Sequence, residues 1–330
     1  MLKMNLKRTL CFLLKFLIVG RMQIENPLVS IIINCFNGDE FLQEALESVG
    51  NQDYTNWEIV FWDNCSLDKS AYIAKSFSEK VRYFKSEVNT PLGEARKRAL
   101  EQCNGKYVSF LDCDDIWCSD QKLSEQVKML EDNPDYALCY GSIEEVLIDK
   151  SHFRFVINKL DSGFIFQDLL LQFEIPIITT TLRRSVLLEN NLSFDTKIKA
   201  SEEYCLFMQL ASIYPIGVSK NVMTKYRVHT SSLTSKSLPI LGYERRYTLN
   251  LILQKKPTLR EKFLKEFQEA YARAAYYDSR WHMYNKDHFK AFRSLSKYAL
   301  LDVRYFVLTI LTLFPVFLWN KVHFSKRNRV

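Results

Sequence analysis

The stretch Tyr107-Val108-Ser109-Phe110-Leu111-Asp112-Cys113-Asp114-Asp115 runs from apolar and aromatic residues directly into three carboxylates. Its first five residues are typical of a strand that is buried on both faces of a parallel sheet. The acids follow where that strand must end, which in open α/β sheets is where ligands bind. Carboxylates this close repel one another unless a cation or hydrogen-bond donors compensate their charge.

The residues alone support two interpretations of these acids. Aspartate is a hard oxygen ligand suited to Mg²⁺ or Mn²⁺, and Mg²⁺ is typically held by one or two carboxylates together with substrate phosphates. The acids can therefore form a metal–diphosphate site. Alternatively, Asp115 or Ser119 caps a helix that begins near Asp120. An Asp-x-Asp-Asp pattern does not decide between the two by itself.

Strands and helices alternate ahead of this stretch. The predicted strands are Val29–Ile33, Glu58–Trp62 and Val81–Phe84. Amphipathic helices follow the first two strands, and a helix over Leu92–Cys103 follows the third. Units of about 25–30 residues of this kind predict an α/β fold with a mostly parallel sheet and helices on both faces.

Polar side chains recur where these strands end. Asn34 and Asn37 follow the first strand, Asp63 follows the second, and Asp112 ends the opening stretch. Polar groups at the same end of successive strands are what a nucleotide cleft requires, although loops are polar in any protein. Neither a Gly-x-Gly-x-x-Gly pattern nor a Walker lysine loop occurs, so dinucleotide and P-loop sites are not predicted.

The pattern changes after Asp135. Antiparallel ribbons, short helices and a long helical region are predicted there. The predicted segments are ribbons at Tyr136–Val146 and His152–Ile157, a helix at Phe164–Phe173, extended chain at Ile175–Thr181, a helix opened by Arg183 and Arg184, an amphipathic helix at Ala200–Leu210, a strand at Val222–Val228 and helices over Leu241–Leu301.

Composition excludes several classes of protein. The 330 residues suffice for one large domain or two smaller ones, and 47% hydrophobic with 25% charged content is ordinary for a globular protein. The net charge of +7 is mild and no Arg-rich stripe occurs, so no nucleic-acid partner is predicted. None of the eight cysteines forms a Cys-x-x-Cys pair, which favours buried thiols in a reducing compartment over a zinc site.

The two ends of the chain differ from its middle. Residues 1–25 hold a short apolar run interrupted by Lys15, which predicts an N-terminal extension without a cleavage site. Tyr305–Trp319 is fifteen residues without a charge and precedes a basic flank. That segment is short for a membrane span, so it predicts a membrane-surface helix, with a helix docked on the domain as the alternative. An aromatic stripe over Tyr271–Phe292 is interpreted as core.

Four motifs occur in a characteristic order. They are Pro27-Leu28-Val29-Ser30-Ile31-Ile32-Ile33-Asn34-Cys35-Phe36-Asn37, then Ile59-Val60-Phe61-Trp62-Asp63-Asn64-Cys65-Ser66-Leu67-Asp68, then Leu92-Gly93-Glu94-Ala95-Arg96, then Asp112-Cys113-Asp114. Over about Pro27 to Thr234, this ordered set resembles a family 2 inverting glycosyltransferase of GT-A fold, of the type that builds bacterial surface polysaccharides.

The resemblance implies a role for each motif residue. Asp63 reads the nucleotide base, and Asp114 is the metal ligand for Mn²⁺ or Mg²⁺, with Asp112 near the ribose and the metal. His229, in Tyr226-Arg227-Val228-His229, either contacts the diphosphate or metal or is an ordinary loop histidine. The remaining residues that the resemblance places in the nucleotide pocket are Asn34, Phe36, Asn37, Gly93 and Arg96.

The catalytic base of that family lies in a Glu-Asp pair at a helix start. Here the pair is Glu202-Glu203, so Glu203 occupies the Asp position with a side chain one methylene longer. Neighbouring helix residues point about 100° apart, so both cannot face the sugar equally, and we expect Glu203 to be the base and Glu202 to assist by positioning. The helix N-terminus stabilises the anion and the apolar surroundings oppose it, and together these effects predict a pKa for Glu203 below neutrality that still leaves it basic enough to assist.

The implied activity is metal-dependent transfer of a sugar, with inversion, from a UDP-sugar to a hydroxyl of a glycan or lipid-linked acceptor. The implied domains are residues 26–235 for catalysis, with a nucleotide half at 26–115 and an acceptor half at 116–235, then a helical extension at 236–301 and a tail at 302–330. The implied location is peripheral, at the cytoplasmic face of the membrane.

Two alternatives to this activity remain open at this stage. A sugar-nucleotidyltransferase requires a Gly-rich, basic phosphate loop after the first strand, and Asn34–Gly38 is not one. A non-catalytic, membrane-associated binder of sugar nucleotides is suggested by the departure at Glu203.

Overall fold

The computed structural model describes residues 26–147, 153–228 and 237–327. The predicted N-terminal extension and His229 lie outside the described residues.

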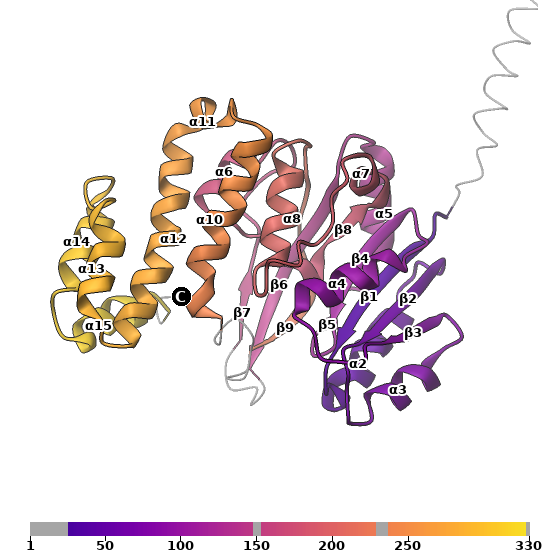
Figure 1. Ribbon diagram of the computed structural model, residues 1–330. Helices are drawn as coiled ribbons and strands as arrows, with labels where there is room; N and C mark the ends of the chain where they lie inside the picture. The colour runs from indigo at the N-terminus through magenta and orange to yellow at the C-terminus, as the bar shows by residue number, and fades with distance from the viewer. Residues whose placement is uncertain (1–25, 148–152, 229–236, 328–330) are drawn as a thin grey trace, which may run out of the picture.

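One mixed sheet organises the first two thirds of the chain (Figure 1). Its strands are β1 (Val29–Cys35), β2 (Trp57–Asp63), β3 (Val81–Lys85), β4 (Tyr107–Asp112), β5 (Ile116–Trp117), β6 (Leu138–Leu147), β7 (Phe153–Val156), β8 (Thr181–Arg183) and β9 (Gly217–Val228). In the described part, the strand order is β3-β2-β1-β4-β8-β6-β9-β5, and β7 pairs with β6.

The first four strands are parallel, as predicted. β1 pairs with β2 on one side and β4 on the other, so that Asn34 stands in register with Trp62 and Asp112. The part of the sheet after β4 is mixed: β8 runs antiparallel to β4 and β6, whereas β6 and β9 run parallel to each other. The predicted antiparallel ribbon of β6 and β7 is confirmed.

Helices cover both faces of this sheet. The helices that lie between strands in the chain are α2 (Asp39–Gly50), α3 (Ser70–Phe77), α4 (Leu92–Glu101), α5 (Lys122–Asp132), α6 (Phe166–Leu171), α7 (Arg184–Glu189) and α8 (Glu202–Ala211). Alternate residues of β1 point to opposite faces. Ile31 and Ile33 pack in a core with α2, α3 and α5, whereas Ile32 packs in a second core with α4 and α8.

The segment Ile175–Thr181, predicted to be extended, is not a strand over most of its length. Ile177–Thr179 forms a 3₁₀ turn, and only Thr181 enters β8. The hydroxyls of Thr179 and Thr180 both donate to the carbonyl of Pro176, at 2.8 and 3.1 Å. Such local side-chain bonds compete with strand pairing. β8 ends at Arg183 and the following helix begins at Arg184, so that only the second of the two arginines belongs to the helix.

Asp115 and Ser119 do not cap a helix. The helix after the acids, α5, begins at Lys122, and its preceding residue Gln121 makes no side-chain cap. Asp115 instead accepts a hydrogen bond from the backbone N–H of Arg227, and Ser119 accepts one from that of Gln121. The helix-cap interpretation of Asp115 is wrong.

The predicted helical region beyond the sheet comprises several helices, which extend to the opposite end of the molecule from β3 (Figure 1). They are α10 (Leu238–Lys255), α11 (Leu259–Lys262), α12 (Leu264–Tyr284), α13 (His288–Ser296), α14 (Val303–Leu311) and α15 (Val316–Arg327). The core interpretation of the aromatic stripe holds only in part. Tyr276 packs in a core and stacks on Trp319, whereas Tyr284 and Phe289 are about three-quarters exposed.

The uncharged tail is two helices rather than one. Chain between Leu311 and Val316, including Pro315, separates α14 from α15. Tyr305 and Trp319 are buried in a core with α12 and α13, so one face of the tail is docked on the protein. In the described ranges, no helix combines the length and apolarity needed to cross a membrane.

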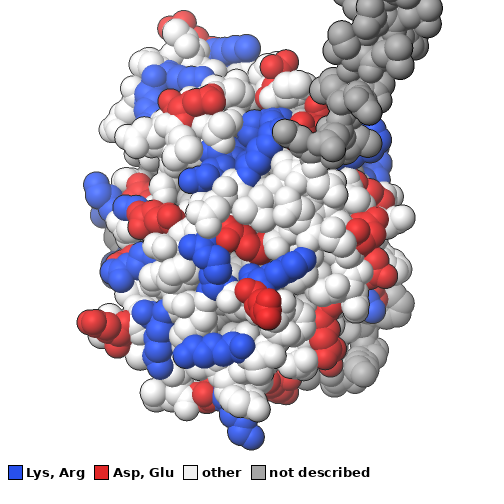
Figure 2. All heavy atoms as spheres, turned by 90° about the vertical axis from the view of Figure 1, so that its right-hand side faces the viewer, with Lys and Arg blue, Asp and Glu red and all other residues white. Residues whose placement is uncertain are grey.

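Surface charge is mixed on the side of the molecule that carries the nucleotide half. The face shown in Figure 2 has Lys and Arg interspersed with Asp and Glu rather than gathered in one stripe.

Candidate active site

Unpaired polar atoms are buried at the carboxyl end of β1. Asn34 is 7% exposed, and neither its Oδ1 nor its Nδ2 has a hydrogen-bond partner among the described residues. Nε1 of Trp62, in register on β2, also lacks a partner in the part of the chain that the structure describes. A buried polar group without a partner costs about 1–3 kcal/mol. Neighbouring buried polar groups without partners indicate a site where a ligand or water would supply the missing hydrogen bonds.

The loops after β1 and β2 are joined to each other. Asn37 has φ of 52°, a left-handed conformation that asparagine tolerates. Its backbone N–H donates to Ser66 Oγ at 3.0 Å, and its Oδ1 accepts from the N–H of Leu67 at 2.9 Å. Asn37 thus holds the two loops together, while the Phe36 ring beside it is about half exposed.

Asp63 lies fully buried at the end of β2. Its carboxylate accepts from the N–H of Ser66 at 2.7 Å and from the hydroxyl of Tyr83 at 2.5 Å. A carboxylate offers about four acceptor positions, so these bonds leave capacity for a ligand donor. Tyr83 lies on β3, and its contact with Asp63 was not predicted from the sequence.

Arg96 joins the carboxyl end of β4 to the acid pair. It is 3% exposed on α4 and pairs with Asp112 at 2.8 Å and with Glu202. Its guanidinium also lies 3.9 Å from Glu203. One buried cation therefore holds three carboxylates from two separate elements, β4 and α8.

The pKa values of these groups reflect that shared cation. Burial alone would lower the pKa of Arg96, but the charges of Asp112, Glu202 and Glu203 outweigh it and raise the pKa. Burial raises the pKa of Glu202, and Arg96 only partly offsets the effect. Burial, and then the charge of Glu202, raise the pKa of Glu203 to about 8, against the lowering effects of Arg96 and Arg245. The predicted pKa below neutrality for Glu203 is wrong, because burial and the charge of Glu202 together outweigh the groups that lower the pKa, Arg96 first among them.

The two acids differ in how they are placed. The side chain of Glu202 is 2% exposed and committed to the ion pair, whereas that of Glu203 is 27% exposed. Of the pair, Glu203 is therefore the more accessible from outside the protein.

Gly93 sets the distance between α4 and the chain leading into α8. A Cβ at this position would lie 2.8 Å from the carbonyl oxygen of Ile198 and 3.2 Å from Cβ of Glu202. The absence of a side chain therefore lets Arg96, one turn further along α4, reach the acids.

The turn after β4 is held from β9. Arg227 donates from its backbone N–H to Asp115 Oδ1 at 2.8 Å and from its guanidinium to the carbonyl of Asp114 at 2.7 Å. It also pairs with Glu44 on α2. The sequence predicted a role for His229, two residues further along, but the bonds of Arg227 to this turn were not predicted.

The acids of the turn suit a divalent cation. Burial, together with the charges of Asp114 and Asp112, raises the pKa of Asp115 well above its usual range. Burial likewise raises the pKa of Asp112, with Asp114 adding to the effect. No cluster of three or more His, Cys, Asp or Glu in the described residues could hold a metal alone. Asp112 and Asp114 nevertheless fit a Mg²⁺ or Mn²⁺ ion whose other ligands come from substrate phosphates and water.

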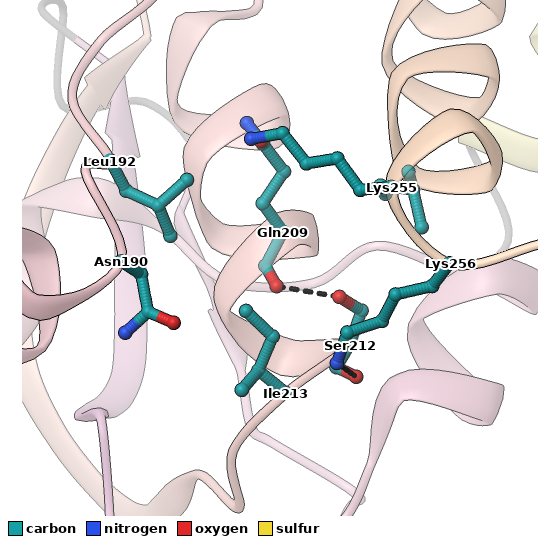
Figure 3. A pocket seen from close by; sticks show the side chains of 8 residues that line it. Asn190, Leu192, Gln209, Ser212, Ile213, Lys255 and Lys256 are labelled. Carbon is teal, nitrogen blue, oxygen red and sulfur yellow. Dashed lines mark hydrogen bonds between the residues drawn. The ribbon is translucent and has the colours of Figure 1, made fainter.

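A cavity of about 170 Å³ lies elsewhere, at the opposite end of α8 from the acid pair (Figure 3). Lys255 there donates to Gln209 Oε1 at 2.8 Å, and Lys256 donates to the carbonyl of Ser212 at 3.1 Å. Both lysines are thus bonded to the end of α8, and the cavity does not belong to the acid site.

Comparison with known proteins identifies the family. The profile of glycosyl transferase family 2 matches residues 30–186. An uncharacterised glycosyltransferase of Rickettsia typhi is 30% identical over 221 residues, which cover 64% of this chain and 68% of that protein. The UDP-Glc:alpha-D-GlcNAc-diphosphoundecaprenol beta-1,3-glucosyltransferase WfgD of Escherichia coli is 29% identical over 214 residues, 64% of this chain and 81% of WfgD.

Solved structures show the same fold. S. aureus TarS 1–349 in complex with UDP-GlcNAc has a TM-score of 0.64 at 18% identity, over 85% of this chain and 83% of that one. The mannosyltransferase PcManGT from Pyrobaculum calidifontis, in complex with GDP-Man and Mn²⁺, has a TM-score of 0.60 at 16% identity, over 89% and 83%. The predicted GT-A fold is confirmed, and the chain belongs to glycosyl transferase family 2 and is a glycosyltransferase.

Proposed function

We propose that this protein transfers a sugar from a UDP-sugar to a hydroxyl of a glycan or lipid-linked acceptor, with inversion at the anomeric carbon, in the synthesis of a surface polysaccharide. The observation that carries the proposal is the position of Arg96. It joins Asp112, at the strand end where a nucleotide-sugar would lie, to the acid pair at the start of α8.

In this mechanism Glu203 takes the proton of the acceptor hydroxyl as the oxygen attacks the anomeric carbon. One base and no protein nucleophile lead to inversion, by the same geometric logic as in inverting hydrolysis. Glu202 stays in its ion pair and keeps Arg96 in place. A raised pKa makes Glu203 a stronger base than an exposed glutamate once it is deprotonated.

The donor end of the site is proposed to use the strand ends. Asn34 would supply its unpaired amide, Asp63 would accept from the nucleotide base, and Asp112 and Asp114 would hold Mn²⁺ or Mg²⁺. When bound, that cation would neutralise charge on the diphosphate leaving group. The Mn²⁺ in the complex of PcManGT supports this choice of metal.

The choice of donor and acceptor rests on the relatives. WfgD is named for a UDP-glucose donor and a diphosphoundecaprenol-linked acceptor, and TarS was solved with UDP-GlcNAc. A lipid-linked acceptor would place this enzyme at the cytoplasmic face of the membrane. The apolar outer face of α14 and the chain after it, which includes Phe306, Ile310, Leu313 and Phe317, is proposed to contact that surface.

The test is a transfer assay with UDP-glucose, UDP-GlcNAc and GDP-mannose against a short lipid-diphosphate saccharide in Mn²⁺. Wild type should release nucleoside diphosphate only with acceptor present and yield a product of inverted configuration by NMR. Glu203→Gln should lower transfer by roughly 10²–10⁴-fold with donor affinity retained, and Asp114→Asn should abolish metal-dependent donor binding. A retained configuration, or full activity of either variant, would refute the corresponding assignment.

A further inference from the structure

A carboxylate from the helical extension reaches the chain that leads into the acid pair. Glu244 lies on α10 and is 2% exposed. Its two oxygens accept hydrogen bonds from the N–H of Lys199 at 2.7 Å, the N–H of Ala200 at 3.2 Å and the hydroxyl of Ser201 at 2.8 Å. Ser201 is the residue immediately before α8, whose first two residues are Glu202 and Glu203.

These bonds take the place of a side-chain cap at the start of α8. Ser201 occupies the N-cap position, where serine commonly accepts from the helix's own N–H groups. Its side chain makes no such bond here, and its hydroxyl is instead directed to Glu244. The entry of α8 is therefore fixed by an element from outside the sheet.

The same loop is held at its other end. The hydroxyl of Tyr247, one turn after Glu244 on α10, donates to Asp195 Oδ2 at 2.7 Å. On the opposite side Gly93 of α4 packs against the carbonyl of Ile198. The loop from Asp195 to Ser201 is thus clamped between α4, which carries Arg96, and α10.

A neighbouring cation extends this link to the first turn of α8. The guanidinium of Arg245 lies 4.4 Å from the ring centroid of Tyr204 and 5.1 Å from that of Tyr277 on α12. Tyr204 directly follows Glu203. Two consecutive residues of α10 therefore contact the chain on both sides of the acid pair.

We propose that Glu244 is a positioning residue for the transfer reaction, which fixes the Asp195–Ser201 loop and thereby sets the placement of Glu203 toward the acceptor. The proposal rests on the proposed function, in which Glu203 is the base. It makes the helical extension part of the active site rather than an appendage. A displacement of about 1 Å at a catalytic group can cost about 10²-fold in rate, so a loosened loop should lower kcat while the donor site, built on the strand ends, keeps its KM.

The experiment compares Glu244→Ala, Glu244→Gln and Tyr247→Phe with a matched control, Glu266→Gln. Glu266 is also an acid of the extension and accepts from Gln167 on α6 at 2.8 Å, but none of its hydrogen bonds in the described residues reaches the loop. We expect Glu244→Ala to lower kcat about 10- to 10²-fold with the donor KM within about twofold. Glu244→Gln, which keeps one acceptor oxygen, should recover part of the loss, Tyr247→Phe should lose a few-fold, and the control should match wild type.

A double-mutant cycle separates this inference from the proposed function. If Glu244 acts through Glu203, Glu244→Ala should add little to the loss already caused by Glu203→Gln. Fully additive losses, or a normal kcat in folded Glu244 variants while Glu203→Gln is inactive, would overturn the positioning role alone. Full activity of Glu203→Gln would instead overturn the base assignment. If Glu244→Ala does not fold, Glu244→Gln and Tyr247→Phe decide, and normal kcat in both would refute the inference.

Discussion

At the residue scale, Glu203 shows how burial and charge set the working range of a base. Its surroundings, first burial and then the charge of Glu202, raise its pKa to about 8. A base acts only when deprotonated, so the rate of transfer should rise with pH and level off above about 8.

The first prediction is that Glu202→Gln moves this rise to lower pH. The substitution removes the acid whose charge raises the pKa of Glu203 and leaves Arg96 with one competitor fewer. The measurement is the initial rate of transfer at saturating donor between pH 6 and pH 9.5. Glu94→Gln, which removes an exposed acid paired with Arg98 on α4, is the control and should not move the profile. A profile unchanged by Glu202→Gln would argue against Glu203 as the titrating base.

The second prediction concerns Lys122, which is fully buried near the start of α5. Its ammonium donates to Ser109 and Gln126, both at 2.8 Å, and lies 4.0 Å from the centroid of the Trp117 ring. Burial lowers its pKa from 10.5 to about 7. Between these values the unfolded chain binds a proton that the folded chain does not, so this contribution to stability rises with pH across the window and is constant below it.

Urea unfolding at pH 7 and pH 9 tests this sign. Wild type should gain stability from Lys122 by up to roughly 1.4 kcal/mol per pH unit, and Lys122→Met should lack that gain. Equal pH dependence in the two proteins would show that Lys122 titrates normally in the folded state.

At the element scale, β9 matters because its residue Arg227 bonds to the turn after β4. The third prediction is that Arg227→Met raises the Mn²⁺ concentration for half-maximal activity about 10-fold, because groups that orient metal ligands typically affect metal affinity by about 10–100-fold. The variant loses the bond to the Asp114 carbonyl but keeps its backbone bond to Asp115. Glu44→Gln weakens only the ion pair between Arg227 and the exposed side chain of residue 44, and it serves as the control. If the Mn²⁺ concentration for half-maximal activity is unchanged, the turn after β4 is not part of the metal site.

Elements were predictable where the signal is local. The β-branched run at Val29 and the acids that follow Leu111 locate two central strands and the edge of the site. The 3₁₀ turn at Ile177 was missed, because two threonine hydroxyls bond to Pro176 and override strand propensity. Glu244 could not be identified at all: in sequence it is an ordinary charged helix residue, and its partners lie more than forty positions away.

At the scale of the whole molecule, the tail has two faces with different roles. Tyr305 and Trp319 complete a core with α12 and α13, so deletion of residues 302–330 would expose that core. The fourth prediction therefore uses Phe306→Ser, Leu313→Ser and Phe317→Ser together, which alter only side chains that are 49%, 60% and 59% exposed. The variant should lose co-sedimentation with anionic vesicles while its donor affinity and unfolding midpoint stay near wild type.

A substitution that removes one positive charge from the tail is the matched control for that experiment. Lys321 is an exposed basic residue on α15. Lys321→Gln should weaken vesicle binding only slightly, by about 1 kcal/mol at most. If the triple variant sediments with vesicles as wild type does, the apolar face of the tail is not the membrane contact.

The bonds between Glu244 and the Asp195–Ser201 loop also limit how this enzyme can be recombined with its relatives. The sheet and α8 come from residues before 229, whereas the acid that holds the entry of α8 comes from residue 244. A hybrid that grafts another extension after β9 keeps every motif of the nucleotide site. It nevertheless leaves three donors without their acceptor, unless the graft carries an acid at the matching turn. A different extension can therefore replace the present one only if the turn of α10 that carries Glu244 and the loop before α8 change together.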